Sequence, residues 1–233
     1  MAVSRGVTSW SFSRWMDYQA CPAKFNYKHL QKLVEPPNDA MRRGIAIHKD
    51  AEDYTRGKLK TLPPTLKKFG AEFKALKKQK VLFVEDNWAF RRDWSLTEWN
   101  NWNECWLRVK LDVAYVNLEH GVLVPIDHKT GRPRDDKNAE YELQLELYGL
   151  AGLLQQPEIP KASPRIWYLD EGVVYPNPEV REIEYTQADV PALKKKWETR
   201  VKKMFVDKTF KPTPGNACRW CHYRKSNGGP CKF

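Results

Sequence analysis

Several ionisable residues in the middle of the chain have types and spacing suited to metal chemistry. The triplet Asp127-His128-Lys129 follows the apolar run 122–126, and residues two apart on a strand share a face, so Asp127 and Lys129 point the same way. Asp112 lies on the preceding segment of alternating apolar residues, which we expect to form the neighbouring strand. Two carboxylates beside the backbone carbonyl of His128 form an oxygen site that Mg²⁺ prefers and Mn²⁺ accepts. The Lys129 ammonium can orient a water or offset charge on phosphate, so this set suits metal-assisted phosphodiester hydrolysis.

Two further signals accompany this triplet, which by itself occurs by chance on many charged hairpins. His48 lies in the predicted helix 41–58 and could add an imidazole ligand to the same metal, although a lone histidine there is more often a core residue. Gln144 and Tyr148 follow the hairpin four residues apart and therefore share one helix face, where helix packing is the simpler explanation.

The segments that must position these residues change between helical and strand periodicity. Ser11 or Ser13 can cap a short aromatic helix that runs through Tyr18 and stops near Cys21. We predict further helices over residues 41–58, 66–76, 138–154 and 187–206, and strands over 107–115, 122–129, 164–175 and 180–185. This order implies one α/β domain over residues 1–233, with a mixed central β-sheet flanked by helices.

Taken together, these motifs resemble the PD-(D/E)XK nuclease superfamily, in particular its RecB/AddB nuclease-domain branch. The segment from Ser11 to Phe25 resembles the N-terminal signature of that branch, and Gly44 to His48 resembles its glycine-to-histidine motif. Gln144 and Tyr148 match its Q-x-x-x-Y motif. The matches run in the family's order over nearly the whole chain.

The resemblance implies a restriction-endonuclease-like core and a Mg²⁺- or Mn²⁺-dependent deoxyribonuclease. Under it Lys129 is the catalytic lysine, and Gln144 and Tyr148 contact the nucleic acid or support the active site. The implied metal ligands are His48, Asp112, Asp127 and the backbone carbonyl of His128.

The substrate and partners are also implied by the resemblance alone. It indicates an exonuclease acting on single-stranded DNA or DNA ends, similar to the stand-alone CRISPR-associated and bacteriophage RecB-like members. Recombination, replication or CRISPR-associated proteins are the partners it suggests. Two alternatives stay open, a structure-selective endonuclease and a catalytically silent nucleic-acid-binding or adaptor protein.

The cysteines form a pattern of their own. Five cysteines, an odd number, argue against a disulfide framework. Cys218 and Cys221 form a C-x-x-C pair in the proline- and glycine-rich C-terminal tail, and Cys231 follows. A bound metal could order such a tail, and Zn²⁺ held by these three cysteines with His222 or Cys21 is the generic interpretation.

The family resemblance implies a 4Fe–4S cluster at these cysteines instead. Four thiolates satisfy such a cluster. It would close the tail, residues 207–233, onto the N-terminal helix, while Cys105 is expected to pack in the interior. The implied cluster ligands are Cys21, Cys218, Cys221 and Cys231.

Charge is distributed in three blocks along the chain. Residues 1–80 carry a net charge of +10, residues 81–190 carry −9, and residues 191–233 carry +10. A polyanion could bind the basic ends while clustered carboxylates in the middle bind cations. Solvated lysine-rich helices would account for the same charges equally well.

Aromatic and basic side chains supply candidates for contact with nucleic acid. Five tryptophans crowd residues 88–106, and most are expected to pack against the sheet, with Trp99 and Trp102 free to stack on bases. The helix 187–206 has a basic face for phosphate contact or for solvent alone. Its candidate residues are Lys194, Lys195, Lys196 and Arg200.

The composition places the chain in a broad class. Its 233 residues include 41% hydrophobic and 12% aromatic residues, which is ordinary globular usage. The first ten residues lack the apolar run of a signal peptide, and the apolar stretch Leu147–Leu154 is too short to span a bilayer. We therefore expect a soluble, cytoplasmic protein of a bacterial, archaeal or virus-infected host cell, with no membrane partner.

Overall fold

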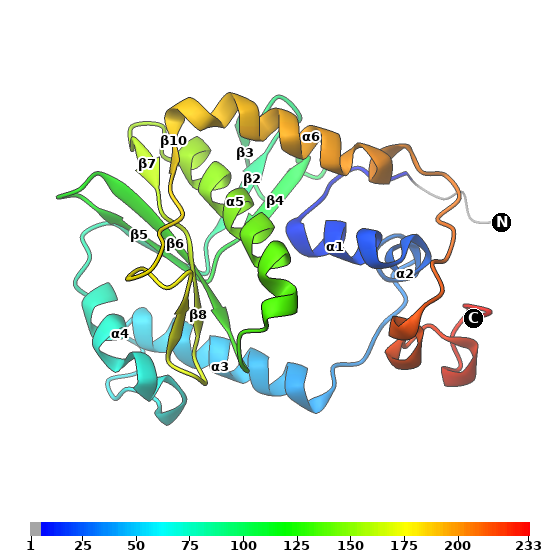
Figure 1. The fold of residues 1–233 in the computed structure, drawn as a ribbon, viewed down its shortest axis with the longest axis horizontal. Coiled ribbons are helices and arrows are strands. Elements are labelled where there is room, and N and C mark those ends of the chain that lie inside the picture. The colour runs from blue at the N-terminus through cyan, green and yellow to red at the C-terminus, as the bar shows by residue number, and fades with distance from the viewer. Residues whose placement is uncertain (1–5) are drawn as a thin grey trace.

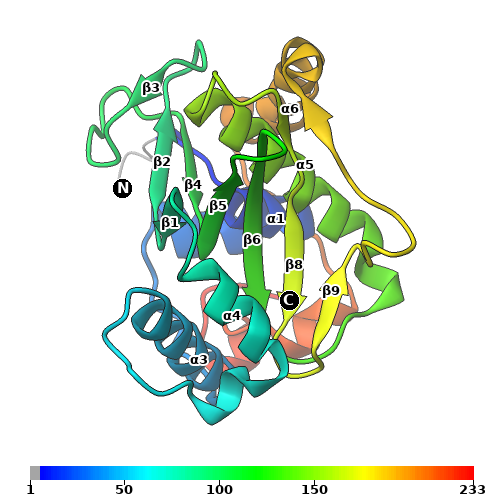
Figure 2. The same ribbon diagram turned by 90° about the vertical axis from the view of Figure 1, so that its left-hand side faces the viewer.

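The computed structural model describes residues 6–233 and places a mixed β-sheet between two layers of helices (Figures 1 and 2). Helices α3 (Asp39–Thr55) and α4 (Gly70–Leu76) cover one face, and α5 (Asn138–Gln155) covers the other. Helix α6 (Val190–Val206) packs on α5 and on α1 (Phe12–Ala20). This layering confirms the predicted α/β class and is consistent with a restriction-endonuclease-like core.

Strand β6 (Val122–Lys129) is the centre of the sheet. It pairs antiparallel with β5 (Val113–Asn117) along one edge and parallel with β8 (Arg165–Tyr168) along the other. Strand β6 therefore has its predicted bounds, and its hairpin partner β5 overlaps the predicted strand only over residues 113–115. The other strands of this sheet are β1 (Leu82–Val84) beside β5, β9 (Val173–Tyr175) beside β8, β7 (Lys161–Ala162) beside the start of β6, and β10 (Tyr185–Thr186) beside β7.

The side chains of β6 alternate between the two helical layers. Val124 and Ile126 join the core under α3 and α4, whereas Leu123 joins the core under α5. Helix α5 approaches β6 closely because Gly152 faces Leu123, where an added Cβ would lie 2.5 Å from a Leu123 methyl carbon. This alternation sends Asp127 and Lys129, which are in phase with Leu123, towards α5.

The predicted strand over residues 107–115 is wrong as a single element. Strand β4 (Leu107–Lys110) pairs with β2 (Asn87–Phe90) in a separate three-stranded sheet, completed by β3 (Leu96–Thr97), and only β5 joins the main sheet. The chain changes sheets at Leu111 and Asp112. Asp112 therefore lies at a junction between two strands instead of within one.

Four other predicted elements are corrected by the structure. The helix predicted over 66–76 begins as a 3₁₀ helix, η2 (Pro64–Phe69), before α4. The strand predicted over 180–185 reduces to the two residues of β10. The strand predicted over 164–175 is two antiparallel strands, β8 and β9, joined by a turn. In α3 the core side chains are Ile47, Ala51 and Tyr54, whereas Met41 and Ile45 are 47% and 64% exposed.

The polypeptide after α6 returns to the N-terminal helices (Figure 1). The Tyr223 hydroxyl donates a 2.9 Å hydrogen bond to the Leu33 carbonyl, and the rings of Tyr27 and Tyr223 lie 5.7 Å apart.

None of the helices in residues 6–233 has the length and apolar character to cross a bilayer. The short helical segments are α2 (Pro22–Phe25), η1 (Asn26–Leu30), η3 (Asp135–Lys137), η4 (Gln187–Asp189), η5 (Asn216–Trp220) and η6 (Lys225–Asn227).

Candidate active site

Asp127 and Lys129 form the first part of the candidate site at the end of β6. The two side chains lie on one face of the strand, as predicted, and Lys129 Nζ lies 2.7 Å from Asp127 Oδ2. The side chain of His128 lies on the opposite face, where its ring packs near Phe73 and Trp167. Burial lowers the pKa of His128 to about 4, so its imidazole is neutral at pH 7.

Gln144 and Tyr148 hold this pair from α5. Gln144 Nε2 donates a 2.8 Å hydrogen bond to Asp127 Oδ1, and Gln144 Oε1 accepts a 3.1 Å hydrogen bond from Lys129 Nζ. The Tyr148 hydroxyl donates to Asp127 Oδ1 over 3.1 Å. The pair does more than pack the helix, because it fixes both the carboxylate and the ammonium of the D-x-K triplet.

Asp112 connects this network to α3. Its Oδ1 lies 3.0 Å from His48 Nδ1, and its Oδ2 accepts a 2.6 Å hydrogen bond from the backbone N–H of His128. Adjacent residues of β6 thus connect the two carboxylates. Asp127 carries one of them, and the backbone amide of His128 binds the carboxylate of Asp112. The structure thus joins His48, Asp112, Asp127 and Lys129 in one hydrogen-bonded network, and their catalytic and metal-binding roles stay predictions.

Glu85 is an additional acidic residue that the sequence analysis did not identify. One ligand atom each from His48, Glu85 and Asp112 lies within 4.8 Å of the others, a spacing suited to one metal ion. Glu85 follows β1 with a φ of 49°, and its N–H donates a 2.8 Å hydrogen bond to the Asp112 carbonyl. Lys110 Nζ lies 2.7 Å from Glu85 Oε2 and supplies its counter-charge.

The two aspartates respond oppositely to their surroundings. Burial raises the pKa of Asp127, against the opposing charge of Lys129. Burial acts in the same direction on Asp112, but the hydrogen bonds with His48 and from the His128 amide hold the pKa of Asp112 below its ordinary value. A divalent cation beside these two carboxylates would favour the charged form of both.

The donor set fits a hard divalent cation. Carboxylate oxygens with one imidazole suit Mg²⁺ or Mn²⁺. Asp127 Oδ2 is enclosed and, apart from its approach to Lys129, has no hydrogen-bond donor among residues 6–233. A depression of about 520 Å³, lined in part by Ile45, His48, Glu85 and Asp112, opens onto the cluster.

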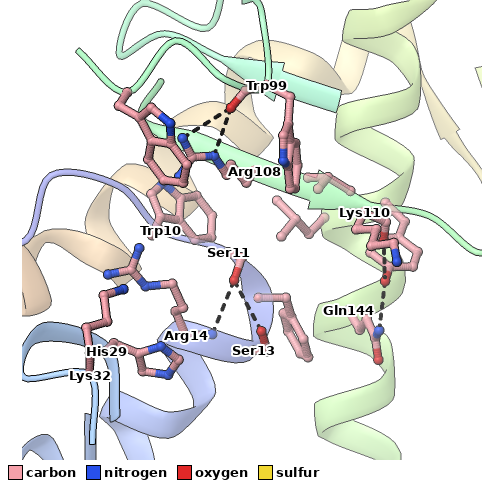
Figure 3. A pocket seen from close by; sticks show the side chains of 15 residues that line it. Trp10, Ser11, Ser13, Arg14, His29, Lys32, Trp99, Arg108, Lys110 and Gln144 are labelled. Atoms are coloured by element: carbon pink, nitrogen blue, oxygen red, sulfur yellow. Dashed lines mark hydrogen bonds between the residues drawn. The ribbon is translucent and has the colours of Figure 1, made fainter. Parts of the chain in front are cut away.

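The tryptophans divide into two groups, as predicted. Trp88, Trp94 and Trp106 are buried, whereas Trp102 is 68% exposed. Trp99 and Trp102 line a cavity of about 350 Å³, and Figure 3 shows Trp99 and Gln144 on its walls. Gln144 and Tyr148, which also line it, bind Lys129 and Asp127 of the D-x-K triplet.

The predicted basic residues of α6 lie elsewhere. None of them lines the cavity with Trp99 and Trp102. The Arg200 guanidinium forms an ion pair with the buried Glu146 of α5 and lies 4.8 Å from the centre of the Trp197 ring. Lys196 lies 3.6 Å from the same carboxylate, whereas Lys195 is exposed and Lys194 half-buried. Arg200 therefore links α6 to α5.

Four of the five cysteines meet beside α2. Cys21, Cys218, Cys221 and Cys231 line one cavity of about 270 Å³, and none of them is in a disulfide. Backbone N–H groups of Thr213 and Gly215 donate 3.4 Å hydrogen bonds to the sulfurs of Cys21 and Cys218. Cys105 is buried away from this cavity, as expected of a packing residue.

Comparison with known proteins identifies the family. The family model described as PD-(D/E)XK nuclease superfamily matches residues 9–226. A crystal structure described as a "Putative exonuclease" from Eubacterium rectale is similar, with 14% sequence identity and a TM-score of 0.48 over 93% of this chain and 88% of that chain. No curated protein matches the chain. With a family model that covers nearly its whole length, the chain belongs to the PD-(D/E)XK nuclease superfamily.

Proposed function

We propose that this protein is a Mg²⁺- or Mn²⁺-dependent exonuclease that hydrolyses phosphodiester bonds in single-stranded DNA or at DNA ends. The observation that carries the proposal is the continuous hydrogen-bonded set from His48 through Asp112 and the His128 amide to Asp127, Lys129 and Gln144. A catalytically silent adaptor would not require a lysine held against a buried carboxylate beside a metal-ligand cluster, so this arrangement favours an enzyme.

Each residue of the set has a distinct proposed role. His48, Glu85 and Asp112, whose ligand atoms lie together, would hold the cation, and Asp127 and the His128 carbonyl are the further ligands that the resemblance implies. When bound, a divalent cation lowers the pKa of a coordinated water and stabilises negative charge on the phosphate. Lys129, held by Asp127 and Gln144, presents its ammonium to the attacking water or to the phosphate oxygen.

The Lys129 ammonium is suited to this role because it stays charged. Burial opposes its charge, yet the Asp127 carboxylate keeps the pKa of Lys129 above its ordinary value. The group can therefore orient a water or stabilise developing negative charge, but it is a poor proton acceptor at pH 7.

We further propose that Cys21, Cys218, Cys221 and Cys231 hold a 4Fe–4S cluster, as in the RecB/AddB branch. The cavity that they share and the N–H···S hydrogen bonds support a bound metal group. The assignment of a cluster over a zinc ion rests on the family resemblance, and metal analysis distinguishes the two.

Digestion of matched DNA substrates tests the proposed activity. Linear and circular single-stranded DNA are incubated with Mg²⁺ or Mn²⁺, and linear duplex serves as a further substrate. The proposal expects metal-dependent loss of linear strands and survival of circles. Cleavage of circles would replace the exonuclease with an endonuclease, and intact DNA in every reaction would contradict both.

A further inference from the structure

The cavity beside the candidate active site carries an unusual concentration of unneutralised positive charge. It lies between the N-terminus of α1, strand β4 and α5 (Figure 3). Arg14 enters it from α1 and Arg108 from β4, while Gln144 and Tyr148 form the wall shared with the D-x-K triplet. Any ligand in this cavity therefore lies against residues that hold Asp127 and Lys129.

The two arginines are held together without a carboxylate. Arg14 Nη1 and Arg108 Nη1 both donate to the Ser9 hydroxyl, over 3.0 and 3.4 Å. Arg108 is only 9% exposed and donates its remaining bonds to the Trp99 carbonyl. Arg14 Nε is buried and has no hydrogen-bond partner among residues 6–233. Within residues 6–233, neither guanidinium lies within 4.0 Å of an acidic oxygen.

Such a pair is costly unless an anion completes it. Two neighbouring cations repel each other, and removing their charges from water costs free energy. Burial, together with the Arg108 charge, lowers the pKa of Arg14 to about 10. Most other arginines of the chain have an acidic partner, including Arg43, Arg56, Arg91 and Arg181. Guanidinium groups are the side chains best suited to phosphate oxygens.

The remaining lining indicates what carries the phosphate. Lys32 adds a third cation, and the Ser11 and Ser13 hydroxyls lie 3.2 Å from each other at the start of α1. The Trp102 ring stacks on Arg108, whose guanidinium carbon is 3.8 Å from the ring centre, and it leaves an exposed aromatic surface at the cavity mouth. Arg14, Arg108 and Lys32 have no acidic partner in the part of the chain that the structure describes. Three such cations match a phosphate monoester, which carries up to two charges, better than an internal diester, which carries one.

We propose that this cavity binds the terminal phosphate of a DNA strand, with Arg14 and Arg108 on the phosphate and Trp102 beside the terminal base. The proposal rests on the proposed nuclease function and adds how the strand end is recognised. The anchored end would set the register of the strand in the neighbouring active site, so cleavage would release products of uniform short length.

Binding in the absence of divalent metal tests the site independently of hydrolysis. Fluorescence anisotropy in EDTA compares one single-stranded oligonucleotide with a 5′-phosphate, a 3′-phosphate or hydroxyls at both ends. We expect one of the two phosphates to tighten binding about tenfold, as a charge-assisted hydrogen-bond pair would. Arg14→Gln and Arg108→Gln should each remove that preference, whereas Arg181→Gln, a surface arginine paired with Glu142, should keep it.

The outcomes separate the two proposals. Equal affinity of the wild type for all three ends, or a preference that survives in folded Arg14→Gln and Arg108→Gln proteins, overturns the phosphate site. Since Arg108 is buried, melting temperatures establish that its variant is folded, and the half-buried Arg14 provides the second variant. A persistent end preference in a protein that cleaves no DNA with any metal would overturn the nuclease function alone.

Discussion

At the scale of single residues, the amide of Gln144 has contacts on both sides of the proposed chemistry. It donates to Asp127 and accepts from Lys129, so its loss frees a buried carboxylate and a buried ammonium together. We predict that Gln144→Leu lowers kcat about tenfold to a hundredfold, because both groups lose their orientation. Single-turnover DNA cleavage measures this effect.

The matched control for Gln144 lies on the same helix. Gln155→Leu, at the opposite end of α5, should keep the wild-type rate. Equal rates for Gln144→Leu and the wild type would show that Gln144 only packs the helix.

Glu85 gives a second test at this scale, independent of catalysis. We predict that Glu85→Gln weakens Mn²⁺ binding about tenfold, because it removes one charge from the cluster with His48 and Asp112. Isothermal titration calorimetry without DNA measures the dissociation constant. Glu104→Gln, which alters an exposed pair with Arg91, is the control, and unchanged affinity in Glu85→Gln would exclude Glu85 as a ligand.

The candidate residues differ in how far local patterns could identify them. The D-x-K spacing places Asp127 and Lys129 on one face, and helical spacing does the same for Gln144 and Tyr148. Glu85 carries no such pattern. It reaches the cluster because β1 pairs with β5 in a register that places Val84 opposite Val113, a contact between segments about thirty residues apart in sequence.

At the scale of elements, Asp17 ties α1 to the following turns. His29 Nε2, Lys28 Nζ and Lys24 Nζ lie 2.8, 3.0 and 3.4 Å from its carboxylate oxygens. Burial alone would raise the pKa of Asp17, but the hydrogen bonds with His29 and Lys28 hold it well below its usual range. Because the folded state lowers this pKa, the stabilisation is full above the unfolded value near 4 and is lost as the pH falls below it.

A substitution at Asp17 should therefore have a pH-dependent effect on stability. We predict that Asp17→Asn lowers the free energy of unfolding by about 1–3 kcal/mol at pH 7, and that the difference from wild type shrinks below about pH 4. Urea unfolding at several pH values measures it. The exposed Glu158→Gln should show no such dependence, and a constant Asp17→Asn difference across the pH range would contradict the assignment.

Elements were predictable where one periodicity ran without interruption. Helix α5 and strand β6 follow their patterns closely. The alternation over residues 107–115 also continues unbroken, yet the strand divides at Asp112 because its two halves find partners in different sheets. Alternation identifies extended chain and does not identify its neighbour.

At the scale of the whole molecule, Cys21 and the three cysteines of the C-terminal tail line one cavity. We predict that protein purified anaerobically contains iron and shows the visible absorption of an iron–sulfur cluster. Cys21→Ser and Cys218→Ser should lose the iron and melt at lower temperature, because each removes a thiolate from the metal group that would link the tail to the N-terminal helices. Metal analysis and thermal melting measure both effects.

The chain supplies its own control for this prediction. Cys105→Ala removes the buried cysteine that lies outside the cavity and should leave the iron content unchanged. Zinc in place of iron, or iron retained in both Cys21→Ser and Cys218→Ser, would overturn the assignment of the cluster.

Metal-dependent cleavage by the wild type beside Lys129→Met tests the central claim most directly. End-labelled single-stranded DNA is incubated with each protein and Mn²⁺, and binding of the same DNA in EDTA is measured in parallel. We predict cleavage by the wild type, at least a hundredfold slower cleavage by Lys129→Met, and similar DNA affinity for both. Equal cleavage by a folded Lys129→Met protein, or no cleavage by the wild type, would contradict the proposed nuclease site.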